Sequence, residues 1–230
     1  MTDLSVIIPA FNEKKTILTI INRINQLDIK KQLIVVDDYS NDGTRKILNE
    51  NHKKVDLLLF HNKNLGKGAA IRTAQKHANG KYTIIQDADL EYDPNDILEF
   101  LEENKKFKYD LIMGSRFIGK KRSVLHFWHM IGNKFITFLF NILNNTTFTD
   151  IYCCYCMFRK DLLNINVLKS YGWGQQAEIL TYIVGKNRRI FEIGVNYNAR
   201  TYTEGKKIRY YDVFAVIFWI IATKIKKSFL

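Results

Sequence analysis

The chain has 230 residues, with 35 Lys and Arg against 23 Asp and Glu, so its formal net charge is +12. Hydrophobic residues make up 47% and charged residues 25%, proportions that exclude a disordered chain and collagen-like repeats. Only two prolines occur, which argues against Pro-rich linkers, and the length suits one large α/β domain or two small ones.

The first 115 residues alternate apolar, β-branched runs with helical patterns. Strands are predicted at residues 4–8, 33–36, 55–60, 82–85 and 111–113, and helices at about 15–27, 44–51, 67–79 and 95–105. The last of these helices has a clear start, with Asp93 as N-cap and Pro94 at its first position. Near-continuous apolar strands that alternate with helices predict an α/β fold, in which helices cover both faces of a mostly parallel sheet.

Two amphipathic helices are predicted in the second half of the chain. The first spans about residues 123–144 and follows Lys120, Lys121 and Arg122. Its apolar positions are Val124, Phe127, Trp128, Ile131, Phe135, Phe138, Leu139 and Ile142. The second, at 214–229, mixes Phe, Ile and Trp with three lysines. Broad apolar faces flanked by Trp and Lys are typical of helices in a bilayer interface, and the alternative is two ordinary core helices.

Positive charge is concentrated towards the C-terminus, where residues 185–230 contain ten Lys and Arg and three Asp and Glu. This excess favours an anionic partner, and together with the amphipathic helices it predicts attachment to an anionic membrane surface. The apolar run 213–222 has ten residues, too few to span a bilayer. No nucleic-acid partner is predicted, because binding one would require stacking aromatics interleaved with basic residues on a single surface.

Three cysteines lie together at Cys153, Cys154 and Cys156, too close in sequence to pair well with one another. An odd count without a second cluster predicts reduced thiols, and no fourth ligand is placed for a zinc site. The N-terminus has no secretion signal. We therefore expect a cytoplasmic protein that is peripherally attached to the cytoplasmic face of a membrane.

Acidic residues follow three of the predicted strands. Glu13 follows the first, Asp37 and Asp38 the second, and Asp87 and Asp89 the fourth. Parallel strands bring their carboxyl ends to one edge of the sheet, where ligands bind. Side chains two apart in an extended chain point the same way, and hard carboxylate oxygens suit Mg²⁺ or Mn²⁺ bound together with substrate phosphates. The alternative for Asp37, as for Asp42, is the capping of turns and helices.

Five short motifs carry a family resemblance. They are Val-Ile-Ile-Pro-Ala-Phe-Asn-Glu at 6–13, Val-Val-Asp-Asp at 35–38, Ser-Asn-Asp-Gly-Thr at 40–44, Gly-Lys-Gly-Ala-Ala at 66–70 and Asp-Ala-Asp at 87–89. Their order and spacing over about residues 3–210 resemble the family-2 glycosyltransferases, most of all the dolichyl- or polyprenyl-phosphate mannose and glucose synthases. The resemblance implies a GT-A catalytic domain at 1–212, a basic amphipathic segment at 213–230, a nucleotide-sugar donor, Mg²⁺ or Mn²⁺, and inversion at the anomeric carbon.

The resemblance also implies roles for individual residues. The positions that match the nucleoside pocket are Pro9, Phe11, Glu13, Val36 and Asp38, and those that match the ribose, metal and diphosphate positions are Asp87, Ala88, Asp89 and Glu91. Among the latter, Asp87, Asp89 and Glu91 are the expected metal ligands. Arg116, Arg200 and Lys206 match cations that bind the nucleotide sugar, and the expected catalytic residues are Asp89, Arg116, Asp150 and Arg200. On the acceptor side, Cys154-Tyr155-Cys156 replaces the family's common Gly-Phe-Lys.

The leading functional hypothesis is transfer of mannose or glucose from a GDP- or UDP-hexose to a polyprenyl or dolichyl phosphate. A phosphate monoester is already largely anionic at pH 7, so the acceptor needs cations around it and no strong base. One alternative is transfer to a sugar hydroxyl in polysaccharide or glycolipid assembly, with Asp150 as the base. Another is a nucleotide-sensing protein without catalysis, which the intact Asp87 and Asp89 disfavour.

Overall fold

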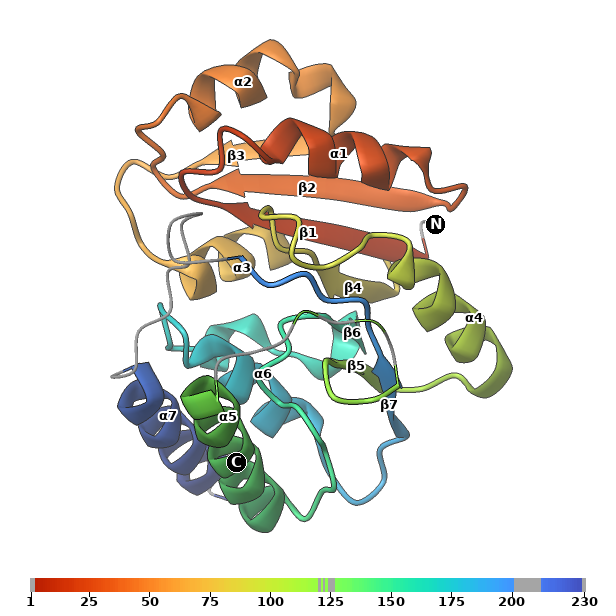
Figure 1. Cartoon of the computed structure of the whole chain (residues 1–230), viewed down its shortest axis with the longest axis vertical. Coiled ribbons are helices and arrows are strands. Elements are labelled where there is room, and N and C mark those ends of the chain that lie inside the picture. Colours follow the sequence, from red (N-terminus) through yellow and green to blue (C-terminus); the bar gives the residue numbers. More distant parts are fainter. Residues whose placement is uncertain (1–2, 120, 122, 124–126, 201–211, 229–230) are drawn as a thin grey trace.

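The computed structural model describes residues 3–119, 121, 123, 127–200 and 212–228 (Figure 1). Its strands are β1 Leu4–Ala10, β2 Lys31–Asp37, β3 Leu57–Phe60, β4 Tyr82–Ile85, β5 Leu111–Ser115, β6 Cys156–Arg159 and β7 Ile190–Gly194. Its α-helices are α1 Ile17–Gln26, α2 Thr44–Glu50, α3 Lys67–Gln75, α4 Asp96–Phe107, α5 Phe127–Asn144, α6 Gln175–Ile183 and α7 Asp212–Lys227. Short 3₁₀ turns occupy His52–Lys54, Lys160–Leu162 and Ile165–Val167.

The described strands form one mixed sheet in the order β3-β2-β1-β4-β6-β5-β7. β1, β2, β3 and β4 are parallel, and β5 and β7 are parallel to each other. β6 is antiparallel to both of its neighbours, β4 and β5. Two reversals across β6 leave β5 and β7 pointing the same way as β4. The carboxyl ends of six strands therefore meet at one edge, as expected for a mostly parallel sheet.

The sheet is buried on both faces because its strands alternate between two apolar layers. In β1, Val6 and Ile8 pack in the larger cluster with α1, whereas Ile7 between them packs in a second cluster with Ala70 and Ala74 of α3. Side chains in a strand alternate with a period of two, so a continuous apolar run supplies both layers. Figure 1 shows helices on both sides of the sheet.

The predicted elements of the first 115 residues are present with small shifts at their ends. The largest shift is at the end of α3, which stops at Gln75 and not at residue 79. Helix α4 begins at Asp96 with Asn95, not Asp93, as N-cap. Asp93 instead accepts a hydrogen bond from the Asn95 amide at 3.0 Å, in a turn that precedes the helix. β6 and β7 have no counterpart in the sequence analysis, because β6 has four residues and β7 carries Glu192 at its centre.

Helices α5 and α7 pack side by side (Figure 1). Much of their apolar surface is exposed to solvent. α5 buries Asn133, Ile136, Thr137 and Phe140, whereas its aromatic stripe is solvent-exposed, and α7 buries Val216 and Ile220. The exposed apolar residues are Phe127, Trp128, Ile131, Phe135, Phe138 and Ile142 of α5 and Phe214, Phe218, Ile221 and Ile225 of α7. None of the helices in the described ranges combines the length and the hydropathy needed to cross a membrane.

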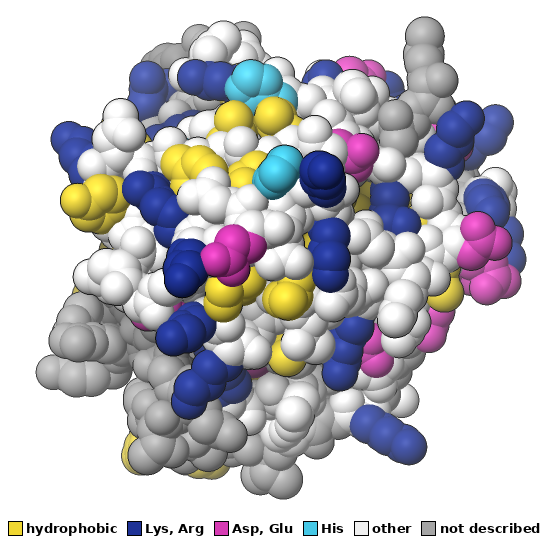
Figure 2. Space-filling model, turned by 90° about the horizontal axis from the view of Figure 1, so that it is seen from above, with side chains coloured by type: hydrophobic (Ala, Val, Ile, Leu, Met, Phe, Trp, Pro, Cys, Tyr) yellow, Lys and Arg dark blue, Asp and Glu magenta, His cyan; other side chains and the backbone are white. Residues whose placement is uncertain are grey.

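Charge is distributed differently from apolar surface. On the face in Figure 2, Lys and Arg side chains are scattered among uncharged ones, with few Asp and Glu. In its described part this face shows no continuous basic stripe.

Candidate active site

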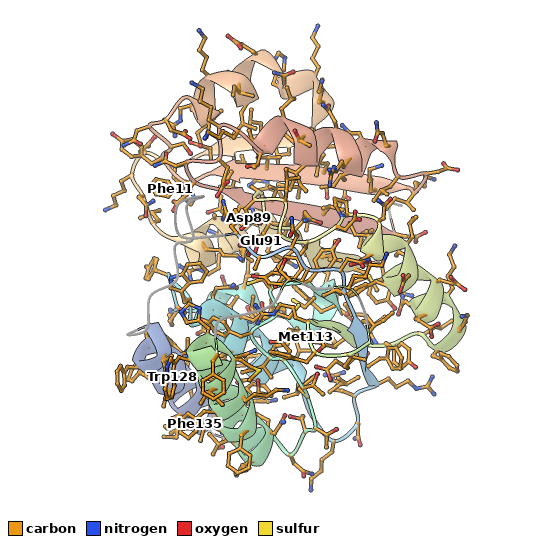
Figure 3. The ribbon with its side chains drawn as sticks, viewed as in Figure 1. Phe11, Asp89, Glu91, Met113, Trp128 and Phe135 are labelled. Atoms are coloured by element: carbon orange, nitrogen blue, oxygen red, sulfur yellow. The ribbon has the colours of Figure 1, made fainter. Side chains whose placement is uncertain are left out.

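A cavity of about 680 Å³ lies at the carboxyl edge of the sheet. Its walls extend from the loop after β1 to the first turns of α5 and α7, where Trp128, Gly132, Val213 and Phe214 contribute. Figure 3 shows Asp89 and Glu91 near the centre of the molecule and Trp128 on α5. The expected site residues that line the cavity are Pro9, Phe11, Glu13, Asp38, Asp87, Ala88, Asp89, Glu91, Arg116 and Arg200.

Among the described residues, two expected site residues do not line the cavity. Val36 is fully buried in the core against α3 and does not line the cavity, contrary to its expected place in a nucleoside pocket. Its position in β2 has the parity of Ile34, so its side chain points into a core layer. Asp150 is fully buried behind Arg116. Lys206 lies outside the described residues.

The Asp38 carboxylate fixes the loop that precedes α3 through hydrogen bonds. Its Oδ1 accepts hydrogen bonds from the Leu65 amide at 2.9 Å and from His61 Nδ1 at 2.7 Å, and its Oδ2 accepts one from the Gly66 amide at 2.7 Å. His61 is itself held through Nε2 by Thr73 of α3 at 2.9 Å. The Asp38 carboxylate is thus largely occupied by its own chain, and it shapes one wall of the cavity.

The neighbouring Asp37 and Asp42 hold local structure, in agreement with the capping alternative. Asp37 accepts from the Ser40 amide and from Arg45 Nε at 3.0 Å, and Asp42 accepts from Thr44 and from the Lys14 amide. Burial acts to raise the pKa of Asp42, but these hydrogen bonds outweigh it and lower the pKa.

Asp87 pairs with Lys67 at the start of α3. Burial acts to lower the pKa of Lys67, but the Asp87 carboxylate raises it above its ordinary value, so the ammonium stays charged. Cys154 lies beside this pair, and burial raises the pKa of its thiol to about 11. All three cysteines are free thiols. The Lys67–Asp87 pair gives this part of the cavity two partly buried, charged hydrogen-bonding groups.

Arg200 lies among three carboxylates. Its Nη2 donates to Asp89 Oδ2 at 2.7 Å, its Nη1 lies 3.3 Å from Glu13 Oε2, and its Nε lies 3.5 Å from Glu91 Oε1. Burial acts to lower the pKa of Arg200, but these carboxylates raise it. Burial, together with the charges of Asp87 and Glu91, raises the pKa of Asp89 to about 7. One guanidinium therefore does not neutralise this cluster.

Glu91 is turned towards the chain after β7. Its Oε1 accepts from the Arg200 amide at 3.0 Å and its Oε2 from the Tyr197 hydroxyl at 3.0 Å. Within residues 3–119, 121, 123, 127–200 and 212–228, no three His, Cys, Asp or Glu side chains come together as a metal-ligand group. The expected three-carboxylate set of Asp87, Asp89 and Glu91 is thus not assembled in this part of the chain.

The donor set still fits a divalent cation of the kind that binds one or two carboxylates together with substrate phosphates. Asp87 and Asp89 both line the cavity, two residues apart after β4. With Glu13, Asp89 and Glu91 ionised, the described groups around Arg200 carry a formal charge of −2. A divalent cation would compensate that charge.

Arg116 is fixed by Asp150 in a bidentate ion pair. Its Nε donates to Asp150 Oδ2 at 2.7 Å and its Nη2 to Oδ1 at 2.9 Å, and Asn133 of α5 donates to the same Oδ1 at 2.7 Å. Burial acts to raise the pKa of Asp150, but Arg116 and Asn133 lower it below its usual range. Glu192 of β7 accepts from the Asp150 amide at 3.2 Å. The arginine is therefore held on the cavity wall by a rigid, buried carboxylate.

The wall facing Lys67 is formed by residues 170–173. Glu178 of α6 accepts hydrogen bonds from the Lys169 and Ser170 amides at 2.8 and 2.9 Å, and the Gly68 amide donates to the Tyr171 carbonyl at 2.8 Å. The ring of Trp173 lies 6.0 Å from the Lys67 ammonium. This packing joins the amino end of α3 to that of α6 and closes the side of the cavity.

Several residues of the site have no counterpart among the expected ones. Lys67 lies in the Gly-Lys-Gly motif and could have been found there as a cation at a helix start. Asn133 lies on the buried face of a helix read chiefly for its apolar positions, and Tyr197 follows a strand that was not predicted. His61 carries no motif signal, since its role depends on the distance to Asp38.

Comparison with known proteins places the chain in a family. The model of glycosyl transferase family 2 matches residues 5–165. An uncharacterized protein of Methanocaldococcus jannaschii is 30% identical over 216 residues, which cover 88% of this chain and 93% of that protein. A dolichyl-phosphate beta-glucosyltransferase of Trichomonas vaginalis is 26% identical, covering 89% of this chain and 68% of the relative. An undecaprenyl-phosphate 4-deoxy-4-formamido-L-arabinose transferase of Proteus mirabilis is 26% identical, covering 88% and 62%.

Solved structures confirm the fold. Glucosyl-3-phosphoglycerate synthase from Mycobacterium tuberculosis, in complex with Mn²⁺, UDP and glucosyl-3-phosphoglycerate, has a TM-score of 0.70 at 18% identity, covering 98% of this chain and 79% of the other. TarS from S. aureus, in complex with UDP-GlcNAc, has a TM-score of 0.66 at 19% identity, covering 96% and 66%. The expected GT-A fold is thus confirmed. With a family model that matches most of its length, relatives that align along nearly all of it and this shared fold, the chain belongs to glycosyl transferase family 2, enzymes that transfer a sugar from a nucleotide-sugar donor.

Proposed function

We propose that this glycosyltransferase moves mannose or glucose from a GDP- or UDP-hexose to a polyprenyl or dolichyl phosphate at a membrane surface. The observation that carries the proposal is the position of Arg116, which is held by Asp150 in a cavity whose far walls are apolar residues of α5 and α7. A lipid phosphate needs a cation for its headgroup and an apolar path for its chain. Relatives named for dolichyl-phosphate and undecaprenyl-phosphate support this acceptor class.

The state of Asp150 disfavours a hydroxyl acceptor. A general base must reach the proton that it removes and must be able to take it up. Asp150 is fully buried, its carboxylate is bound bidentately by Arg116, and its pKa is lowered. We assign it to positioning Arg116, whose planar guanidinium suits phosphate oxygens. Transfer to a phosphate fits this arrangement because that acceptor arrives already ionised.

Asp89 and Asp87 are the residues we assign to a divalent cation, Mg²⁺ or Mn²⁺. When bound, such a cation offsets the negative charge that develops on a departing diphosphate. Mn²⁺ accompanies UDP in the mycobacterial synthase of the same fold. Glu91 then has a supporting role, through its bonds to Tyr197 and the Arg200 amide. Inversion at the anomeric carbon follows from attack by the acceptor oxygen opposite the leaving diphosphate.

We assign the nucleotide-sugar donor to the end of the cavity that is lined by the loop after β1, away from the apolar residues of α5 and α7. Pro9 and Phe11 provide apolar contacts for the base, and Asp38 holds the loop around it. Ala88, the small residue between the two aspartates, leaves room for the ribose and diphosphate. Arg200 and Lys206 complete the proposed cations for the phosphate groups.

Peripheral attachment to the cytoplasmic face of a membrane is part of the proposal. It is supported by the exposed apolar faces of α5 and α7, with Lys224, Lys226 and Lys227 in the last turn of α7. Side chains of this kind lie in a bilayer interface, and lysines are attracted to anionic lipid. Residues 213–230 thus act as a membrane-contact segment, whose helix α7 packs on α5 and α6 of the catalytic domain.

The test is an assay with purified protein, Mg²⁺, vesicles that contain polyprenyl phosphate, and a panel of labelled GDP- and UDP-hexoses. We expect label in the extracted lipid with one donor, and loss of that label in excess chelator and in Asp89→Ala. Asp161→Ala is the matched control, since Asp161 is an exposed aspartate paired with Arg159 outside the cavity. A parallel assay adds a free oligosaccharide as the acceptor, and label in that oligosaccharide with none in lipid would establish the hydroxyl-acceptor alternative.

A further inference from the structure

Both oxygens of Asp89 are already used by the chain. Oδ1 accepts from the Glu91 amide at 3.1 Å and Oδ2 from Arg200 Nη2 at 2.7 Å. Arg200 also reaches Glu13 and Glu91, so its guanidinium is the cation among these three carboxylates in the described part of the chain. The carboxylate proposed to bind a metal is thus paired with an arginine.

We infer that the Arg200 guanidinium competes with the divalent cation for Asp89 and must leave that carboxylate before the cation binds. This inference rests on the proposed metal use. A guanidinium hydrogen-bonded to Oδ2 occupies one of the two lone pairs of that oxygen and places a positive charge where a metal ion on Asp89 would sit. The guanidinium and the metal ion would also repel each other, because Coulomb repulsion at about 4 Å between a unit charge and a divalent ion is large in a partly buried site.

The shared contacts of Arg200 also explain why a divalent cation can replace this arginine on Asp89. Arg200 supplies one positive charge to three carboxylates, so the described groups of the cluster keep a formal charge of −2 when all three carboxylates are ionised. A divalent ion supplies the missing charge, and a nucleotide diphosphate offers Arg200 another anion. Metal and nucleotide should therefore bind with positive coupling, each favouring the state in which Arg200 has left Asp89.

The experiment measures Mn²⁺ binding to nucleotide-free protein by electron paramagnetic resonance of the unbound ion. Arg200→Gln should bind Mn²⁺ about tenfold more tightly than the wild type, or more, because it removes the competing charge. Arg200→Lys keeps a cation and should bind as weakly as the wild type. Arg159→Gln is the matched control: Arg159 also bridges two aspartates, Asp110 and Asp161, but it lies outside the cavity, so its loss should change nothing.

Arg200→Met, which keeps much of the aliphatic stem, is the second variant should Arg200→Gln fail to fold by circular dichroism. Mn²⁺ affinity that is unchanged or weaker in the folded neutral variant, while UDP or GDP still promotes Mn²⁺ binding to the wild type, would overturn the inference and leave the proposed function standing. If Mn²⁺ bound to no variant even with nucleotide present, both the inference and the proposed metal would fail.

Discussion

Three aspartates of this site show how partners decide what a carboxylate can do. Asp38 accepts hydrogen bonds from two backbone amides and from a histidine, and it thereby fixes the loop before α3. Asp150 is matched by a bidentate arginine, which lowers its pKa. Asp89 is buried near other carboxylates with a shared arginine, and its pKa rises to about 7. The first two are fixed structural anions, whereas Asp89 is the group with charge left to compensate.

Asp150→Asn tests the pairing with Arg116. Removing one partner of a buried pair costs about 3–5 kcal/mol of unfolding free energy, since the other charge stays buried. A lowered folded pKa stabilises the protein above the unfolded value of about 3.9, and that contribution is lost as pH falls through the folded pKa. Urea unfolding should thus separate wild type from Asp150→Asn at pH 7, with a smaller gap below about pH 4. An equal gap at both pH values would contradict the charge pairing.

At the scale of elements, the site depends on how closely α3 approaches the chain before α6. A Cβ added at Gly68 would lie 2.5 Å from the Ser170 carbonyl oxygen, and one added at Gly66, where φ is +87°, would lie 2.4 Å from that of Tyr171. Both glycines of the Gly-Lys-Gly motif therefore serve backbone packing, and Gly66 also serves a left-handed turn. That contact sets the distance between Lys67 and the Trp173 wall.

Gly68→Ala should consequently destabilise the protein by about 1–3 kcal/mol, the usual range for overpacking. For a chain of this size, each kcal/mol lowers the melting temperature by roughly 2–4 °C. Gly172→Ala is the matched control, because a Cβ there meets no atom within 4 Å. Thermal unfolding followed by circular dichroism compares them. Equal melting temperatures for the two variants would show that the backbone around Gly68 can accommodate a methyl group without loss of stability.

At the scale of the whole molecule, the carboxyl edge of the sheet binds the nucleotide sugar in our proposal, and α5 and α7 present apolar side chains to solvent. Phe214 is 72% exposed and Phe218 is 62% exposed, whereas Val216 and Ile220 of the same helix are fully buried against the core. α7 is thus both part of the fold and part of the surface. Deleting residues 213–230 would uncover core side chains, so the proposed membrane contact needs point substitutions to test it.

Phe214→Ser combined with Phe218→Ser should weaken binding to anionic vesicles, because it removes two exposed aromatic side chains and leaves the buried ones in place. We expect the protein to move to the supernatant in vesicle sedimentation, and salt to weaken wild-type binding by screening the lysines, since the Debye length falls to roughly 3 Å at 1 M. Phe107→Ser, at an exposed aromatic of α4, should leave sedimentation unchanged. An equal loss of vesicle binding in Phe107→Ser would show that any exposed aromatic side chain contributes to binding, and would contradict a specific role of α7.

The sequence by itself determined the parallel sheet, the edge where acidic residues gather and the family, because apolar runs, helix periodicity and motif order are local properties. It also predicted that Asp87, Asp89 and Arg116 would line one site, since strand ends of one direction share an edge, whereas Arg200 was expected there only from the family resemblance. Only the tertiary structure decided the pairings. Arg116 meets Asp150 34 residues away, and Arg200 meets Asp89 across 111 residues. Likewise, periodicity shows that one face of α5 is apolar, but whether that face is buried depends on which neighbours pack against it, and these leave the aromatic stripe outside.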